Sequence, residues 1–265
     1  MTAIAVTIAG SDSGGGAGIQ ADLKTFSALG VYGASVVTAL TAQNTKGVTA
    51  IHDVPPEMIA AQIDAVFSDL HVSAVKIGML SQAASIEVVA AGLDHWRARQ
   101  VVLDPVMIAS SGDRLLAADA VDVLKRLLIP RARVMTPNLP EAAALLGLPE
   151  AKTEEEMGEQ ARGLLALGVE TVVVKGGHGS GADSVDLVVG RDSHMRLSRA
   201  RLPAKNSHGT GCAFSAALAA GLANGMDVEA AARAAKDYVH AALAAADALG
   251  VGSGRGPLHH FHGWW

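Results

Sequence analysis

The feature that most constrains the fold is an alternation between short runs of β-branched residues and longer segments rich in alanine and leucine. Short apolar runs bounded by turn residues are typical of buried strands, and longer amphipathic segments are typical of helices. Strands that alternate with helices favour a mostly parallel sheet with helices on its faces. The alternation therefore predicts a layered α/β fold.

The chain divides into predicted elements as follows. The expected strands cover residues 4–9, 35–40, 74–77, 101–103, 133–135 and 171–175. The expected helices cover residues 19–29, 56–70, 83–97, 117–128, 139–146, 153–167, 211–224 and 228–249. Alternation over 184–203 predicts an antiparallel hairpin at the edge of the sheet. Because no Pro- or Ser-rich linker divides the chain, residues 1–265 are expected to form one domain.

Composition narrows the expected ligand. The net charge is −5 and no run of Lys or Arg occurs, so neither nucleic acid nor an anionic membrane is an expected partner. The expected ligand is a small molecule. A single cysteine and an N-terminus without a secretory pattern predict a cytoplasmic protein. Apolar stretches are shorter than the ~20 residues that a membrane helix needs.

A glycine-rich loop, Gly10–Gly18, follows the first expected strand and precedes a helix that carries Asp22. It fits a loose dinucleotide-binding pattern, which would indicate a Rossmann-type oxidoreductase. The second strand, however, ends in Leu40–Gln43 and lacks the acidic residue that such sites use for the ribose. Asp22 is therefore interpreted either as a hydrogen-bonding partner of a small substrate or as a solvated charge on a helix.

Three polar side chains follow two of the later strands. Asp104 comes after one strand, and Asn138 and Glu141 come after another. Oxygen ligands of this kind suit Mg²⁺ beside phosphate groups, although helix capping would explain Asn138 and Glu141 equally well. Lys175 ends a further apolar strand before a glycine loop, where it either neutralises phosphate charge or extends to solvent.

The segment Asn206–Ala213 opens a long helix and contains the only cysteine, Cys212. Glycines at 209 and 211 allow close approach of the backbone, and a helix N-terminus attracts anions. The same position is expected to lower the pKa of the thiol. The alternative is an ordinary turn with a small buried cysteine. The His-rich tail, His259–Trp265, is expected to pack on the domain or on an oligomer partner rather than to bind metal.

Taken together, these motifs resemble the hydroxymethylpyrimidine/phosphomethylpyrimidine kinases of thiamine biosynthesis, within the ribokinase-like superfamily. The matching segments are 10–25, 38–45, 76–80, 104–107, 175–178, 206–212 and the His-His-Phe-His tail. The resemblance implies a ribokinase-like three-layer α/β/α fold with a mostly parallel central sheet. It also implies that ATP phosphorylates 4-amino-5-hydroxymethyl-2-methylpyrimidine and then its monophosphate at one site.

The resemblance further implies roles for individual residues. The pyrimidine would contact Gly10, Ala17, Asp22, Gln43, Met79 and Val106. ATP would contact Thr136, Asn138, Lys175, Gly177, Gly209 and Gly211, and Mg²⁺ would be held by Asp104 and Glu141. Catalysis would involve Cys212, Gly209, Thr210, Gly211 and Lys175. Cys212 stands where many sugar kinases of the superfamily have an aspartate base, and the sequence leaves open whether its thiol is a base or only orients the hydroxyl.

Other interpretations are kept beside this one. A pyridoxal kinase of the same superfamily is the nearest alternative, although Met79 and Gln43 favour the pyrimidine. An oxidoreductase and a non-catalytic pyrimidine-binding regulator are the others. A homodimer is expected by family analogy alone. Glycines at 112 and 176–181 are candidate hinges.

Overall fold

The computed structural model describes residues 2–107, 116–117, 119–177 and 181–265. The candidate hinge at 112 and part of the one at 176–181 therefore lie outside the described residues. The strands are β1 (Ile4–Asp12), β2 (Tyr32–Asn44), β3 (Gly47–Asp53), β4 (Ala74–Ile77), β5 (Val101–Leu103), β6 (Val134–Met135), β7 (Thr171–Lys175), β8 (Asp183–Gly190) and β9 (His194–Ala200).

Helices connect most of these strands. They are α1 (Gly18–Ala28), α2 (Pro56–Phe67), α3 (Ala83–His95), α4 (Ala120–Val123), α5 (Leu139–Leu146), α6 (Glu154–Leu165), α7 (Thr210–Ala223) and α8 (Val228–Ala244). A π-helical turn (Leu124–Leu128) and a 3-10 turn (Ile129–Arg131) follow α4, and a second 3-10 turn (Ala246–Leu249) follows α8.

The described strands form one nine-stranded sheet in the order β3-β2-β1-β4-β5-β6-β7-β8-β9. The central strands β2, β1, β4, β5, β6 and β7 are parallel, while β3 and the β8–β9 hairpin pair antiparallel at the two edges. The predicted α/β fold and the edge hairpin are confirmed. The strand β3 was not predicted, because four of its seven residues are exposed and its apolar pattern is weak.

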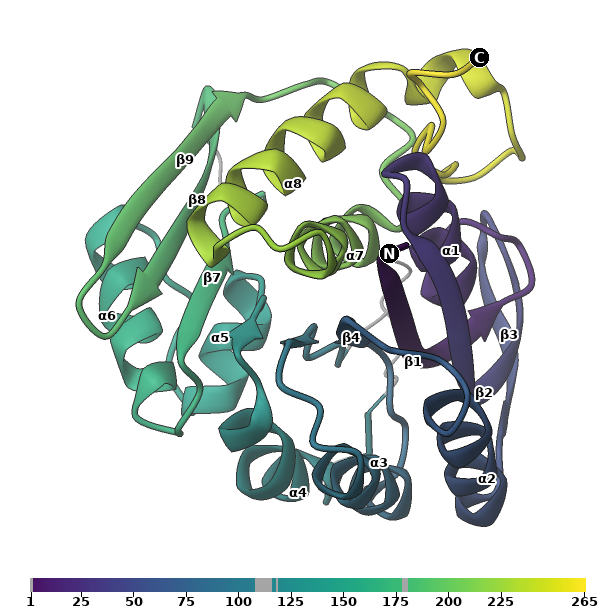
Figure 1. The fold of residues 1–265 in the computed structure, drawn as a ribbon. Helices are drawn as coiled ribbons and strands as arrows, with labels where there is room; N and C mark the ends of the chain where they lie inside the picture. Colours follow the sequence, from purple (N-terminus) through teal and green to yellow (C-terminus); the bar gives the residue numbers. More distant parts are fainter. Residues whose placement is uncertain (1, 108–115, 118, 178–180) are drawn as a thin grey trace.

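Two apolar clusters lie on opposite faces of the sheet. Val102 joins the cluster of α1, α7 and α8, whereas its neighbours Val101 and Leu103 join the cluster of α2, α3 and α6. This alternation follows from the two-residue period of a strand, which points successive side chains to opposite faces. Figure 1 shows the resulting layers, with α1, α7 and α8 on one side of the sheet and α2, α3 and α4 on the other.

The predicted helix at 117–128 differs from the structure. Only Ala120–Val123 is α-helical, and Leu124–Leu128 forms a π-helical turn. Pro130 follows within the 3-10 turn and lacks the amide hydrogen that a continued helix would use. By contrast, α5 has the predicted bounds, and its capping box between Asn138 and Glu141 explains where it begins.

The C-terminal tail packs on the domain, as one of its two interpretations predicts. Leu258, His259 and His260 are buried, and the Tyr238 hydroxyl donates a hydrogen bond to the His260 carbonyl oxygen at 2.8 Å. Burial lowers the pKa of His260 to about 4, so this ring is neutral at physiological pH. Trp265 lies over His259 with a ring-centroid distance of 4.7 Å.

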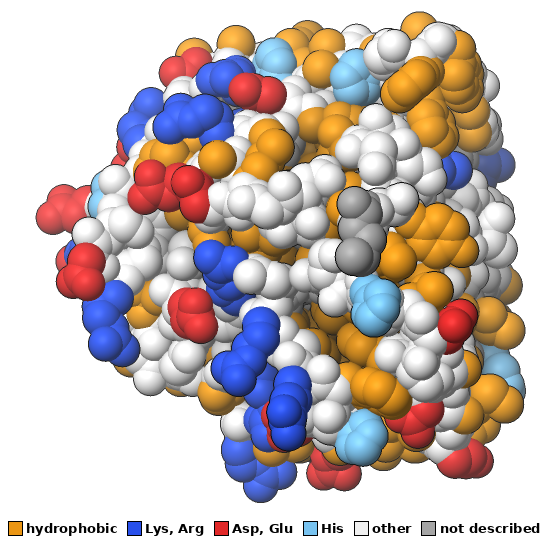
Figure 2. All heavy atoms as spheres, in the orientation of Figure 1, with side chains coloured by type: hydrophobic (Ala, Val, Ile, Leu, Met, Phe, Trp, Pro, Cys, Tyr) orange, Lys and Arg blue, Asp and Glu red, His pale blue; other side chains and the backbone are white. Residues whose placement is uncertain are grey.

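Charged side chains of both signs are spread over the face drawn in Figure 2, and apolar side chains gather there near the C-terminal segment. None of the described helices combines the length and hydropathy needed to cross a membrane.

Candidate active site

The carboxyl ends of the central strands and the N-terminus of α7 enclose a cavity of about 780 Å³. Parallel α/β sheets bind ligands at this edge. Most residues predicted for the site lie on its wall: Gly10, Ala17, Gln43, Met79, Asp104, Val106, Asn138, Glu141, Lys175, Gly177, Gly209, Thr210, Gly211 and Cys212. Asp22 and Thr136 are not among the wall residues.

Asp22 is fully buried and forms an ion pair with Lys76. Its Oδ2 accepts hydrogen bonds from Lys76 Nζ at 2.8 Å and from Thr7 Oγ1 at 2.6 Å. Lys76 lines the cavity, Asp22 does not, and Asp22 Oδ1 has no hydrogen-bond partner among the described residues, so the contact of Asp22 with the pyrimidine stays a prediction. From the sequence, Lys76 was assigned no role beyond its place in the matching segment 76–80. A lysine inside the apolar strand β4 is nevertheless a recognisable sign of a buried charge.

Thr136 is also buried and bonds to a neighbouring side chain. Its hydroxyl donates to Asp104 Oδ1 at 3.2 Å, and Ser215 donates to Asp104 Oδ2 at the same distance. Lys175 Nζ completes the set at 2.8 Å from Oδ1. Thr136 therefore helps to fix Asp104, and its predicted contact with ATP stays a prediction.

A small charge cluster surrounds Lys175. Burial alone would lower the pKa of Lys175, but Asp104 and Glu141 raise it, so the side chain carries a positive charge. Burial would likewise raise the pKa of Asp104, but Lys175 and Lys76 lower it. Glu141 is different, since burial raises its pKa to about 7 despite the nearby Lys175. Asp104 and Lys175 are therefore charged, whereas Glu141 is only partly ionised near neutral pH.

The oxygen atoms beside Lys175 could bind Mg²⁺ mainly through water, with few direct bonds. No described group of three or more His, Cys, Asp or Glu side chains is arranged to hold a metal ion. Asp104 is bonded to three protein donors, and Glu141 accepts from the Asn138 amide at 2.8 Å. Mg²⁺ commonly keeps several waters and binds through one or two carboxylates plus phosphate oxygens. The two carboxylates fit that type of water-mediated site.

The N-terminus of α7 is held against the first glycine loop. Gly209 has φ +81°, and a Cβ at this position would overlap the carbonyl oxygen of Gly16. A Cβ on Gly211 would lie 3.2 Å from Lys175 Nζ, so the lysine ammonium lies over the first turn of the helix. The helix N-terminus and a lysine therefore bring positive charge to one point of the wall.

Cys212 lies half-buried on the wall, and its surroundings oppose ionisation. Burial raises the pKa of its thiol to about 11, although Lys76 and a hydrogen bond from the Gly18 amide act in the opposite direction. The expected lowering by the helix N-terminus is therefore wrong, because desolvation is the larger effect here. At neutral pH this side chain is a thiol.

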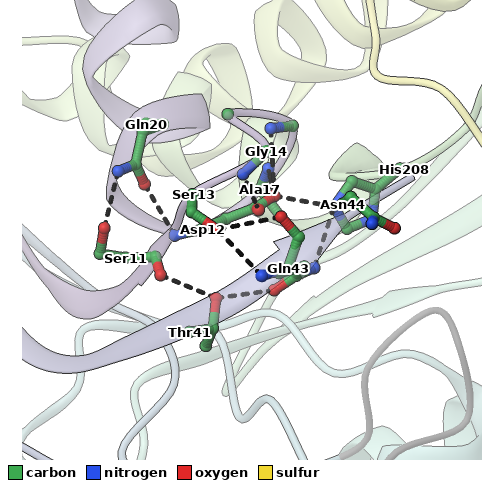
Figure 3. Close-up of polar contacts among 12 residues, drawn as sticks. Ser11, Asp12, Ser13, Gly14, Ala17, Gln20, Thr41, Gln43, Asn44 and His208 are labelled. Atoms are coloured by element: carbon green, nitrogen blue, oxygen red, sulfur yellow. Dashed lines mark hydrogen bonds and ion pairs between the residues drawn. The ribbon is translucent and has the colours of Figure 1, made fainter. Parts of the chain in front are cut away.

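A second set of wall residues was not assigned roles from the sequence. Asp12 accepts hydrogen bonds from the amides of Gly14, Gly16 and Ala17 and lies 2.9 Å from His208 Nε2 (Figure 3). His208 follows β9 at the entry to α7, and its backbone amide donates to the Gly256 carbonyl. The two residues join the glycine loop to the segment that precedes α7. Their separation of 196 positions explains why local motifs did not connect them.

The fold and the position of the cavity fit the class that the motifs indicate, a ribokinase-like kinase of small molecules. A family described as phosphomethylpyrimidine kinase matches residues 12–259. The hydroxymethylpyrimidine/phosphomethylpyrimidine kinase of Rhizobium meliloti is 59% identical over 265 residues, which are 100% of this chain and 99% of that protein. The chain therefore belongs to the phosphomethylpyrimidine kinase family, and the resemblance of its motifs is confirmed.

Two further comparisons describe its relatives. The thiamine biosynthesis bifunctional protein ThiED of Geobacter sulfurreducens is 51% identical over 255 residues, covering 96% of this chain and 51% of that protein. The structure of the pyridoxal kinase from Staphylococcus aureus in complex with ADP matches with a TM-score of 0.91 and 31% identity, covering 100% of this chain and 95% of that one.

Proposed function

We propose that this chain uses ATP to phosphorylate hydroxymethylpyrimidine and then its monophosphate, in thiamine biosynthesis. The observation that carries the proposal is the convergence of Lys175, the α7 N-terminus and Cys212 on one cavity. Full-length identity of 59% to a hydroxymethylpyrimidine/phosphomethylpyrimidine kinase, against 31% to a pyridoxal kinase, supports the pyrimidine as substrate.

The phosphate end of the site would consist of backbone amides and Lys175. Amides at Gly209, Thr210 and Gly211 would receive the oxygens of the transferring phosphoryl group, and Lys175 would neutralise their charge. Mg²⁺, held by Asp104 and Glu141 largely through water, would neutralise further phosphate charge. Most of the catalysis of phosphoryl transfer comes from positioning and charge stabilisation of this kind.

The acceptor end would be formed by the remaining wall residues. Met79 and Val106 would supply apolar walls for the ring, and Gln43 would bond its polar edge. Cys212 would lie beside the hydroxymethyl group. Because its pKa is raised to about 11, we propose that the thiol orients the hydroxyl rather than serving as a preformed thiolate base. In a loose transition state the bond to the nucleophile is only slightly formed, so orientation matters more than early deprotonation.

Phosphorus NMR tests the proposal. Protein, ATP, Mg²⁺ and hydroxymethylpyrimidine should yield successive signals of the pyrimidine monophosphate and diphosphate, and a parallel reaction with pyridoxal should yield much less product. Phosphorylation of pyridoxal alone would favour the alternative kinase. A reaction without added Mg²⁺ tests whether the transfer requires the cation.

Three further expectations have the same basis. A single kinase domain over 1–265, a cytoplasmic location and a homodimeric assembly are proposed from the family relationship. Sedimentation at a monomeric mass would remove the homodimer.

A further inference from the structure

Four side chains on the cavity wall form a continuous polar chain: Asp12, His208, Gln43 and Thr41 (Figure 3). His208 Nε2 lies 2.9 Å from Asp12 Oδ2 and 3.3 Å from Gln43 Nε2. Thr41 Oγ1 lies 3.0 Å from Gln43 Oε1 and 2.9 Å from the Ser11 carbonyl oxygen. The protons of this chain can be assigned one by one.

Asp12 fixes the proton on His208. Its carboxylate accepts from three backbone amides at 2.8–3.1 Å. Burial would raise its pKa, but His208 and those amides lower it, so Asp12 is ionised and can only accept. His208 Nε2 therefore carries a hydrogen and donates. That hydrogen points to Asp12 and Nε2 has no lone pair left, so the Gln43 atom 3.3 Å away must be an acceptor that shares the hydrogen, because an amide donor there would find nothing to accept its hydrogen.

Thr41 fixes the other half of the Gln43 amide. Its hydroxyl has one hydrogen, and the Ser11 carbonyl oxygen, which cannot donate, requires it. The Gln43 atom that faces Thr41 must therefore be a donor. Both requirements are met when the carboxamide is turned by 180°, with Oε1 toward His208 and Nε2 toward Thr41; the two orientations have nearly the same shape.

We propose that His208 is a specificity-determining positioning residue, which, with Thr41, locks the Gln43 carboxamide in this orientation. Each terminal atom of Gln43 keeps one bonding position, an acceptor at Oε1 and a donor at Nε2. A 4-aminopyrimidine edge presents the complementary pair, an amino donor beside a ring-nitrogen acceptor. The inference rests on the proposed function. The order of the acceptor Oε1 and the donor Nε2 matters only if the position of the reacting hydroxymethyl group fixes the orientation of the ring.

The 4-oxo analogue of hydroxymethylpyrimidine provides the test, since it has the same outline with donor and acceptor exchanged. In the wild type, kcat/KM for the 4-amino compound should greatly exceed that for the 4-oxo compound. In His208→Leu this preference should fall by about 10-fold or more, mainly through the KM of the amino compound, because a freed carboxamide can turn to suit either edge. His208→Gln keeps an N–H toward Gln43 and should retain most of the preference.

Lys24→Met is the matched control. Lys24 Nζ donates to the Gly15 carbonyl at 2.7 Å, so this change loosens the same glycine loop without touching Gln43. It should leave the amino/oxo preference unchanged. If His208→Leu lowers both substrates equally and keeps the preference, His208 only holds the loop and the inference is overturned.

Binding of the two analogues, measured by calorimetry, separates this inference from the proposed function. A wild type that binds the amino compound preferentially, with His208→Leu losing that preference, would support the inference even if no phosphoryl transfer occurred. A wild type that binds the two equally would overturn it, whatever its turnover.

Discussion

Lys76 and Asp22 form an ion pair without solvent exposure: Lys76 Nζ lies 2.8 Å from Asp22 Oδ2, and both side chains are 0% exposed. Burial would lower the pKa of Lys76, but Asp22, Cys212 and Asp104 raise it, so the lysine stays charged within the wall of the cavity. Among the described residues, Asp22 is the only one of these three within hydrogen-bonding distance of Lys76 Nζ. The pair therefore keeps a cation at the wall of the cavity without solvent to stabilise it.

Asp22→Ala should lower the free energy of unfolding by about 3–5 kcal/mol, because it leaves the buried Lys76 charge without its partner. Urea unfolding measures this change. The double variant Asp22→Leu/Lys76→Met removes both charges and should regain much of the lost stability without regaining turnover. An Asp22→Ala protein as stable as the wild type would contradict the structural role.

The reactivity of Cys212 should rise with pH well beyond neutrality. Only the thiolate is alkylated, and burial raises the thiol pKa to about 11, so the rate should increase ~10-fold per pH unit between pH 7 and 10. Iodoacetamide labelling followed by mass spectrometry measures it, since the chain has one cysteine. Lys76→Met should move the profile to still higher pH, because Lys76 lowers the pKa of this thiol. A plateau below pH 8 would instead indicate a preformed thiolate.

The sequence predicted the parts of the fold that local patterns specify. β-branched runs located the parallel strands, and the Asn138–Glu141 capping box located the start of α5. The π-helical turn after α4 and the exposed strand β3 were not predicted, because pairing with distant elements decides them.

The site shows the same division. Glycine loops and strand ends identified most wall residues, because the edge of a parallel sheet collects them. The ion pair of Asp22 with Lys76 was not predicted, because the two residues are 54 positions apart and no local spacing records that pair. The hydrogen bond from Thr136 to Asp104 was not predicted for a similar reason, since the two residues follow neighbouring strands.

Gly209→Ala should lower turnover by more than backbone strain at one glycine would cause. A Cβ at 209 combines a positive φ of +81° with overlap of the Gly16 carbonyl oxygen, so the glycine loop and the α7 N-terminus must separate. Gly225→Ala is the matched control, with φ +82° and no neighbouring atom within 4 Å. The control should lose about 1 kcal/mol of stability and no turnover, whereas Gly209→Ala should lose most turnover. Equal effects in thermal unfolding and kinetics would show that only backbone strain matters.

Lys175→Met should act mainly on the transfer of the phosphoryl group. The variant removes the cation that lies over the first turn of α7 and leaves Asp104 and the ionised fraction of Glu141 facing the cavity without it. Their repulsion toward ATP phosphates should weaken ATP binding, and turnover should fall by about 100-fold, the usual effect of removing one preorganised charge-stabilising group. Steady-state kinetics and calorimetry with ATP measure the two effects.

Two variants make the Lys175 prediction specific. Lys152→Met removes an exposed lysine outside the cavity wall and should change neither quantity. Lys175→Arg keeps the charge but replaces a compact ammonium by a planar guanidinium, so it should restore ATP binding better than turnover. If Lys175→Met binds ATP and turns over as the wild type does, the lysine serves only to hold Asp104, and the amides of α7 must stabilise the phosphoryl group without it.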